Sequence, residues 1–254
     1  MSFLTTIRKE GSSWLEALRA LHELNKDHDD TTQVFRIIQA LRSDSNERAL
    51  ERFRTTPVGA RVLAENRCLI EALSDRATLA AMPDGSLGRA YLDFMVAQGI
   101  TAEGLAGMST GIWNEDGPPE MVTFQSWSRD MHDLWHVAVG YGPDPLGELC
   151  LLAFTYAQYE SRGVGLIALM GALRYSLQCR DVRIARAVLQ GHRIGRSSEW
   201  LPSHDWEALL ALPIEEVRRR LRLRPTTAYA AARALMPKHH RSGIAPVAPY
   251  VQPA

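Results

Sequence analysis

Hydrophobic residues recur along most of the chain at spacings of three and four, whereas the alternation typical of half-buried strands is nearly absent. This periodicity predicts an all-α protein. Candidate N-capping residues precede many of the periodic segments. Gly99 is expected to end the helix that carries Tyr91, Phe94 and Met95. The candidate caps are Ser12, Thr31, Thr56 (before Pro57), Asp75 and Ser86.

The middle of the chain has a clear loop signal, at Gly111–Pro119, with helical periodicity after it. No internal repeat and no linker is visible, so we expect residues 1–236 to form a single compact multi-helix domain. Residues 237–254 are rich in proline and lack apolar periodicity, which predicts a disordered tail. The later helices are expected at about 126–139, 145–161, 164–178, 180–193, 204–211 and 213–222.

The composition argues against several classes of protein. The 254 residues are 46% hydrophobic, and 29 acidic residues balance 29 basic ones, so no net charge favours nucleic acid. Three scattered cysteines, Cys68, Cys150 and Cys179, form no Cys-x-x-Cys pair and are expected to be reduced. The longest apolar stretch, 164–173, is too short to span a membrane. The N-terminus resembles neither a signal peptide nor a transit peptide.

The most informative segment combines two imidazoles and two carboxylates. His132 and His136 are one helical turn apart and project from the same face, and Asp133 borders that face. A turn rich in glycine and proline follows, so Glu148 can return on a second helix opposite the histidines. Imidazole and carboxylate are the ligands of divalent metals such as zinc and ferrous iron. The sequence therefore predicts a metal site at a helix–turn–helix junction.

Other interpretations of this segment compete with the metal site. A His-x-x-x-His pair alone is more often a core or surface feature, and only the nearby Asp133 and Glu148 shift the balance towards a metal. Zinc proteases carry Glu, the general base, where this chain has Asp133. The His-Asp phosphohydrolases need further His and Asp ligands, which the remaining histidines do not convincingly supply. A hydrolase of prenyl phosphates is a weaker alternative.

Three segments resemble a known family. The run from Arg129 to His136 followed by Leu146-Gly147-Glu148 is similar to the pattern His-Asp-x-x-His, eleven residues, Glu of the coenzyme Q (ubiquinone) biosynthesis protein four family. Gly85–Tyr91 resembles that family's Gly-[Ser/Thr]-Leu-Gly-Arg-x-Tyr segment. Asp205–Leu210, with Pro213–Arg218 after it, resembles its C-terminal element. The similarity covers about residues 30–225, and the bipartite metal pattern is its most specific part. Eukaryotic members of that family carry transit peptides, so the resemblance implies that this chain is a bacterial cytoplasmic protein.

The resemblance implies removal of the ring C1 carboxyl group from a polyprenylated 4-hydroxybenzoate, coupled to hydroxylation at that carbon. It also implies a metal, zinc by family expectation, held by His132, Asp133, His136 and Glu148. Four protein ligands would fill a tetrahedral site, so catalysis would need expanded coordination, or Asp133 or Glu148 acting as a base instead. Iron is the alternative, because two histidines and a carboxylate suit ferrous iron in oxygen chemistry.

Residues near the motif have two interpretations each. Arg129 could bind a substrate carboxylate, or it could form an ordinary salt bridge with Asp130 or Asp133. Asp130 could orient a metal-bound histidine or be a solvated acid near a helix start. The tryptophans Trp113, Trp127 and Trp135 could line a pocket, although core packing is the commoner role.

The rival function is a non-catalytic lipid-binding organiser that presents prenylated intermediates to other ubiquinone-pathway enzymes. The apolar stretches 149–154 and 164–173 would line a lipid tunnel in that case, or form an ordinary core. The arginines between Arg218 and Arg224 could contact anionic lipid at the inner membrane, or complement a helix dipole. The expected partners are a polyprenylated aromatic lipid, other enzymes of the pathway and further copies of the chain.

Overall fold

The computed structural model describes residues 15–23, 33, 36–37, 40–41, 44–99, 117–236 and 250. Within these residues the chain is helical and contains no strand, which confirms the all-α class; one isolated bridge joins Ser86 and Pro213. Residues 15–23 are helical as well. The labelled helices are α3 (Ser45–Arg54), α4 (Pro57–Glu65), α5 (Leu69–Ser74), α6 (Arg76–Ala81), α7 (Leu87–Gln98), α9 (Pro119–Val139), α10 (Pro145–Tyr159), α11 (Arg162–Cys179), α12 (Arg183–Ser197), the 3-10 turn η1 (Leu201–Ser203), α13 (Trp206–Leu210), α14 (Ile214–Arg220) and α15 (Thr227–Arg233).

Several helix ends lie where the capping residues predicted them. The side chains of Thr56, Asp75 and Ser86 each accept a hydrogen bond from the backbone N–H three residues later, which confirms these three N-caps. Gly99 ends α7 in the left-handed conformation, with φ 65°, as expected for a glycine C-cap. The candidate caps Ser12 and Thr31 lie outside the described residues.

Other boundaries differ from the expectation. Helix α9 begins at Pro119, seven residues before the predicted start, because proline is well suited to the first turn of a helix and polar residues here do not interrupt it. The second helix of the predicted junction, α10, begins at Pro145 as expected, and Asp144 caps it by accepting from the Gly147 N–H. Helix α12 continues to Ser197, and α15 had no predicted counterpart.

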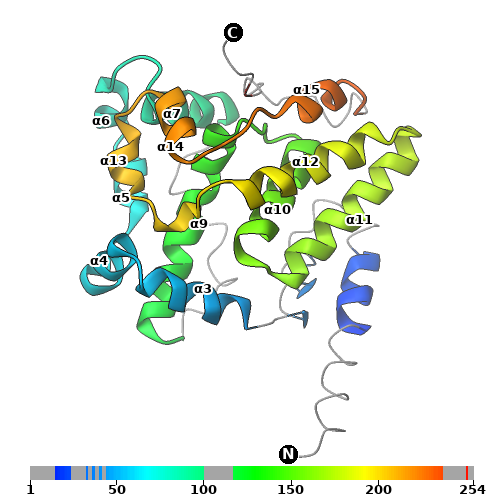
Figure 1. Ribbon diagram of the computed structural model, residues 1–254, viewed down its shortest axis with the longest axis horizontal. Helices are drawn as coiled ribbons and strands as arrows, with labels where there is room; N and C mark the ends of the chain where they lie inside the picture. Colours follow the sequence, from blue (N-terminus) through cyan, green and yellow to red (C-terminus); the bar gives the residue numbers. More distant parts are fainter. Residues whose placement is uncertain are drawn as a thin grey trace, which may run out of the picture.

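Helix α9 runs through the middle of the molecule, with α4–α7, α13 and α14 on one side and α10–α12 on the other (Figure 1). Helices α10 and α12 approach closely because glycines face the neighbouring backbone. A Cβ added to Gly191 would lie 2.4 Å from the Cys150 carbonyl oxygen. A Cβ added to Gly195 would lie 2.7 Å from the Phe154 carbonyl oxygen. Most buried hydrophobic residues form one core cluster, and Ile167 of α11 joins a smaller second cluster with residues of 15–41.

Two segments that are far apart in the sequence, 85–91 and 205–218, meet in the structure. The Leu87 N–H donates to the Leu212 carbonyl at 2.9 Å, and the Ile214 N–H donates to that of Gly85 at 2.9 Å. These contacts hold the start of α7 against α13 and α14, and α7 in turn packs on α9. The two segments therefore support the helix that carries the histidines.

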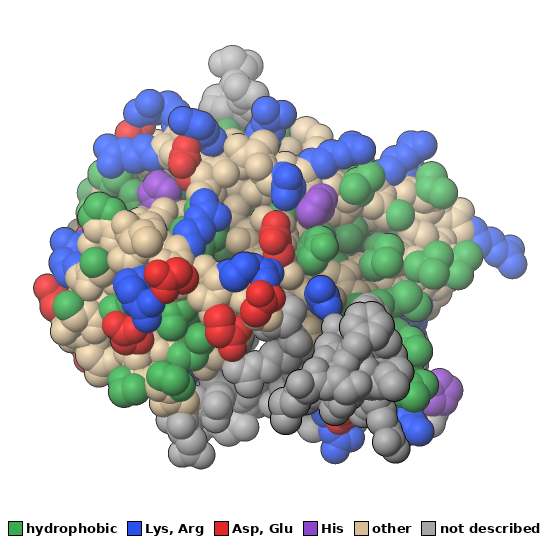
Figure 2. Space-filling view, turned by 60° about the horizontal axis from the view of Figure 1, so that its bottom comes forward, with side chains coloured by type: hydrophobic (Ala, Val, Ile, Leu, Met, Phe, Trp, Pro, Cys, Tyr) green, Lys and Arg blue, Asp and Glu red, His purple; other side chains and the backbone are tan. Residues whose placement is uncertain are grey.

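The surface agrees with the balanced composition. On the face shown in Figure 2, acidic and basic side chains are interspersed. Among the described helices, none combines the length and the hydropathy that a membrane-spanning helix requires. Tyr250 lies in the segment expected to be a disordered tail, yet it is only 8% exposed and its ring packs under the Arg218 guanidinium at 4.3 Å.

Candidate metal centre

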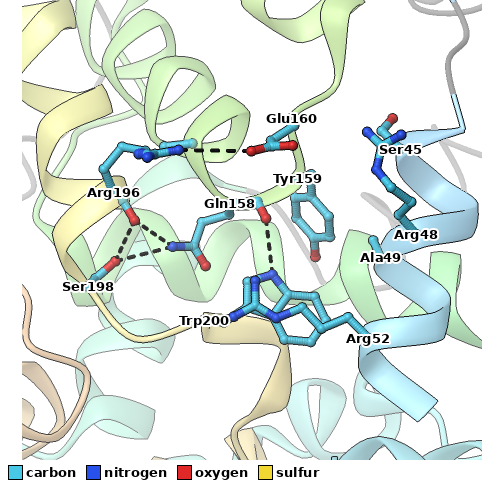
Figure 3. Close-up of a pocket in the computed structure, with 12 residues that line it drawn as sticks. Ser45, Arg48, Ala49, Arg52, Gln158, Tyr159, Glu160, Arg196, Ser198 and Trp200 are labelled. Carbon is cyan, nitrogen blue, oxygen red and sulfur yellow. Dashed lines mark hydrogen bonds and ion pairs between the residues drawn. The ribbon is translucent and has the colours of Figure 1, made fainter. Parts of the chain in front are cut away.

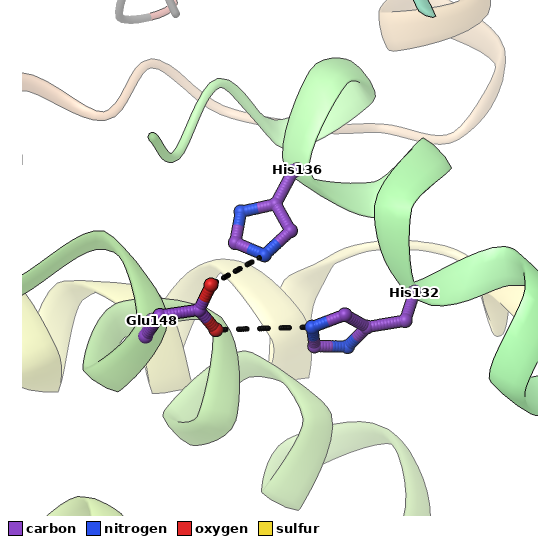
Figure 4. A group of neighbouring side chains, drawn as sticks. All are labelled: His132, His136 and Glu148. Atoms are coloured by element: carbon purple, nitrogen blue, oxygen red, sulfur yellow. Dashed lines mark ion pairs between the residues drawn. The ribbon is translucent and has the colours of Figure 1, made fainter. Parts of the chain in front are cut away.

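The turn between α9 and α10 brings three of the four predicted ligands together. His132 and His136 lie one turn apart near the C-terminal end of α9, and Glu148 lies in the first turn of α10. Gly140 ends α9 with φ 87°, a conformation that favours glycine, and the chain then reverses. As a result Glu148 points towards both imidazoles from the opposite side (Figure 4).

The distances between the donor atoms suit a shared cation. Glu148 Oε1 lies 3.1 Å from His136 Nε2, and Glu148 Oε2 lies 3.8 Å from His132 Nε2. One ligand atom from each residue lies within 4.8 Å of the other two. A metal with bonds of about 2.0–2.2 Å to nitrogen and oxygen would hold its ligand atoms a little over 3 Å apart. The group needs only small adjustments to reach that spacing.

The protonation of His136 gives a test of fit that is independent of spacing. Its Nδ1 lies 3.0 Å from the Tyr141 carbonyl oxygen, which can only accept, so Nδ1 carries a proton. In the neutral ring Nε2 then presents a lone pair to the Glu148 carboxylate. That contact is repulsive unless a second proton or a cation lies between the two atoms. Fixing the tautomer through the second ring nitrogen is the usual arrangement for a metal-bound histidine.

The pKa values of His136 and Glu148 also indicate that the site favours a cation. Burial lowers the pKa of His136, but the adjacent Glu148 carboxylate raises that pKa more, to about 9. Burial raises the pKa of Glu148, and the two histidines outweigh it and hold that pKa well below its usual range. The site therefore contains a carboxylate that strongly favours a positive charge beside it, from a proton or from a metal.

The exposure of the three residues leaves one side open. The His136 side chain is 2% exposed, whereas those of His132 and Glu148 are 39% and 40% exposed. The Phe94 ring stacks on His136, with ring centroids 5.8 Å apart, and closes the inner side. Three protein ligands with an accessible fourth position are typical of catalytic zinc sites, whereas structural zinc sites have four protein ligands.

Asp133, the fourth predicted ligand, is not part of this donor group. It is partly buried beside it, and burial raises the pKa of Asp133 while the two histidines lower it. Asp133 follows His132 directly and so projects about 100° away around the helix. The sequence predicted this offset but could not decide whether the side chain reaches the metal.

A buried network holds the turn that joins the two halves of the site. The Tyr229 hydroxyl on α15 accepts from the Gly142 N–H at 3.0 Å and donates to the Asp144 carboxylate. The Tyr229 ring packs edge-on against Tyr141 at 5.3 Å, and Arg233 pairs with Asp144 at 3.0 Å. The network thus positions both the carbonyl that orients His136 and the N-terminus of the helix that carries Glu148. No local pattern around residue 229 indicated this role.

Arg129 and Asp130 form a buried ion pair with each other. Arg129 Nε and Nη2 lie 2.9 and 2.8 Å from Asp130 Oδ1, and the Asp130 carboxylate, 1% exposed, also accepts from the Ile70 N–H. This geometry matches the salt-bridge interpretation of Arg129. Among the described residues, the partners of the Asp130 carboxylate are Arg129, Ile70 and Cys68 and include no histidine, whereas the Tyr141 carbonyl orients His136.

The tryptophans and the arginine cluster have structural partners. Trp127 and Trp135 are buried in the main core, and Trp113 lies outside the described residues. Arg218 is 9% exposed and donates to the carbonyls of Val137 and Ala138 at the end of α9. Arg219 and Arg220 pair with Glu216, and Arg222 pairs with Glu199. Arg218 therefore complements the C-terminal end of α9, whereas contact of the exposed arginines with anionic lipid stays a prediction.

The comparisons with known proteins agree on one family. Residues 36–227 match the model of the family described as coenzyme Q (ubiquinone) biosynthesis protein Coq4. Similar proteins include the mitochondrial ubiquinone biosynthesis protein COQ4 of Coprinopsis cinerea, 26% identical over 164 residues, which are 65% of this chain and 55% of that protein. The mitochondrial COQ4 homologue of Danio rerio is 30% identical over 145 residues, 57% of this chain and 49% of that protein. The chain thus spans about half the length of these relatives.

A solved structure shows the same fold. The crystal structure of a ubiquinone biosynthesis protein from Nostoc punctiforme PCC 73102 superposes with a TM-score of 0.62. The match covers 83% of this chain and 96% of that one, at 21% sequence identity. At this identity the likeness concerns the arrangement of the helices alone.

Proposed function

The chain belongs to the coenzyme Q (ubiquinone) biosynthesis protein Coq4 family, and on that basis we propose that it acts in ubiquinone biosynthesis on a polyprenylated 4-hydroxybenzoate. The reaction is removal of the ring C1 carboxyl group, coupled to hydroxylation at the same carbon. The observation that carries the proposal is the convergence of His132, His136 and Glu148 at the α9–α10 junction, with one side accessible.

These three residues would hold a divalent metal, with zinc expected and ferrous iron the alternative. Such a metal would supply Lewis-acid stabilisation of the negative charge that is left on the ring when carbon dioxide departs. The chain itself orients His136 through the Tyr141 carbonyl and keeps its inner side dry with Phe94. Asp133 lies beside the donor group and is the carboxylate left to act as a base.

Coupled hydroxylation sets a requirement for a second substrate. An aryl carboxylic acid, dioxygen, two protons and two electrons yield a phenol, carbon dioxide and water. The oxidant is dioxygen, and the two electrons come from an external donor, such as another enzyme of the pathway. This requirement favours a chain that works beside partner enzymes in the bacterial cytoplasm or at the membrane surface.

The alternative function is a non-catalytic organiser. The metal then stabilises the helix junction, and the protein presents prenylated intermediates to other enzymes. The accessible fourth position favours the enzyme, because a structural metal site gains nothing from exposure to solvent.

Replacing Glu148 by Gln tests the choice between these functions. An enzyme loses at least about a hundredfold in turnover, because the neutral amide binds a metal poorly, while binding of a prenylated hydroxybenzoate persists. The control is Glu120→Gln, which removes the first-turn carboxylate of α9, and it should match the wild type. Carbon dioxide release and lipid binding are measured on the same preparations. No turnover in the wild type with a reductant and dioxygen favours the organiser, whereas unchanged turnover in the folded Glu148→Gln variant would show that the metal centre is not the catalytic site.

A further inference from the structure

A pocket of about 350 Å³ lies at the C-terminal end of α10, where that helix meets α3, the end of α12 and the segment before η1 (Figure 3). Its volume falls in the range of about 300–1,000 Å³ that is usual for small-molecule sites. Glu148 and Gln158 are about ten residues apart on α10, which corresponds to about 15 Å along the helix. The pocket is therefore separate from the candidate metal centre.

The floor of the pocket is held by Gln158, a buried side chain whose hydrogen bonds fix its surroundings. The Gln158 amide nitrogen donates to the Gly195 carbonyl at 2.7 Å and to that of Glu199 at 3.2 Å. Its amide oxygen accepts from the Leu201 N–H at 2.9 Å. The Gln158 backbone carbonyl accepts from the Trp200 indole at 3.0 Å. These bonds join α10, α12 and the following turn, so the floor is formed before any ligand arrives.

Arg52 lies over this floor without an acidic partner. Its guanidinium carbon is 4.3 Å from the centre of the Trp200 ring, and Trp200 is only 6% exposed. No carboxylate of the described residues forms an ion pair with Arg52. Partial burial lowers the pKa of Arg52, and Glu160, which lies beyond ion-pair distance, raises it by less. Stacking on a fixed indole leaves the edge of the guanidinium, with its N–H donors, available to an oxyanion.

The other charged groups of the pocket add to its positive charge. Arg48 and Arg196 line it together with Arg52, and Glu160 is the single carboxylate among the lining residues. Arg196 and Glu160 are 3.9 Å apart and both 63% exposed, which makes this a weak pair. Arg48 pairs with Asp44, which is 72% exposed. Arg52 is thus the cation whose charge is least compensated.

We propose that this pocket binds a small organic anion through a phosphate or carboxylate group that reaches Arg52, with Arg48 and Arg196 on its two sides. Guanidinium groups bind both kinds of oxyanion in a bidentate manner, and the volume leaves room for an organic group beside the charge. The site does not depend on the metal. It gives the chain a second ligand, at the opposite end of the helix that carries Glu148.

The arginines also have a role within the fold that could account for them alone. Helices α10 and α12 both end at the pocket, and the partial negative charge of a helix C-terminus attracts cations. In that case the arginines would neutralise the helix ends and bind no ligand. The two explanations differ in whether a soluble anion binds.

The test is a calorimetric titration of the purified full chain with inorganic pyrophosphate and, separately, with succinate, at constant ionic strength. The variant is Arg52→Gln, and the matched control is Arg54→Gln, on the same helix but paired with Glu51 and Glu120. Both substitutions remove one positive charge. We expect saturable binding to the wild type, about tenfold weaker binding to Arg52→Gln, and binding within about twofold of the wild type for Arg54→Gln.

Tighter binding of pyrophosphate would assign a phosphate ligand to the pocket, and tighter binding of succinate a carboxylate. Circular dichroism of both variants verifies that they are folded. Failure of the wild type to bind either anion, or equal binding by Arg52→Gln and the wild type, would overturn the proposal. Anion binding that requires an added metal and persists in Arg52→Gln would take place at the metal centre, and it would count against binding in the pocket.

Discussion

At the scale of single residues, His136 explains most about the candidate site. Its Nδ1 is committed to the Tyr141 carbonyl, so its Nε2 must face the Glu148 carboxylate across a proton or a cation. The sequence predicted which side chains converge, because helical spacing and a proline-glycine turn determine their faces. The expected ligands also included Asp133, which lies outside the donor group, because helical spacing does not determine whether a side chain at the border of the helix face reaches a metal.

Replacing Arg129 tests whether this residue stabilises the fold or binds the substrate. Arg129→Gln should lower the free energy of unfolding by about 1–3 kcal/mol, because the buried Asp130 carboxylate loses its cationic partner. Urea unfolding measures this loss, and binding of a prenylated hydroxybenzoate should stay within twofold. A variant of wild-type stability that binds the lipid poorly would instead assign Arg129 to the substrate.

At the scale of helices, the fold was predictable where local chemistry decides it. Thr56, Asp75, Ser86 and Gly99 mark helix ends in the sequence and in the structure. Helix α15 was not predicted, because Thr227–Arg233 is short and alanine-rich and gains its stability from packing against α12 and α10. Its contribution to the site, through Tyr229, is therefore a long-range property.

The Tyr229 hydroxyl should matter to the metal centre although it does not touch it. Tyr229→Phe leaves the Gly142 N–H and part of the Asp144 carboxylate without a partner, which loosens the turn between His136 and Glu148. We expect zinc affinity, measured by chelator competition, to fall by about 10–100-fold. Tyr159→Phe is the control, because it removes a hydroxyl bonded to Ser128 away from that turn. Equal zinc affinity in the two variants would show that the network does not position the site.

The close contact between α10 and α12 should tolerate no side chain at residue 191. Gly191→Ala places a Cβ against the Cys150 carbonyl, and we expect a loss of about 1–3 kcal/mol in the free energy of unfolding. Gly171→Ala, where the nearest atoms are the flexible end of Leu149, should be close to neutral. Thermal or urea unfolding compares the two. A destabilised Gly171→Ala beside a neutral Gly191→Ala would contradict the packing described above.

At the scale of the whole molecule, one helix joins the candidate metal centre to the proposed anion pocket. Helix α10 carries Glu148 of the metal centre at its N-terminal end and Gln158 of the anion pocket at its C-terminal end. Periodicity predicted the all-α class, because it depends on the average of many positions. The pocket could not be predicted, since Arg52, Gln158 and Trp200 are brought together only by the packing of separate helices.

The most direct measurement is the metal content of the purified chain, by elemental analysis, beside a His132→Ala/His136→Ala double variant. We expect about one zinc or iron per wild-type chain and none in the double variant, with both proteins helical by circular dichroism. A wild-type chain without metal, even after incubation with zinc or ferrous iron, would contradict this expectation. Equal metal content in the folded double variant would do the same.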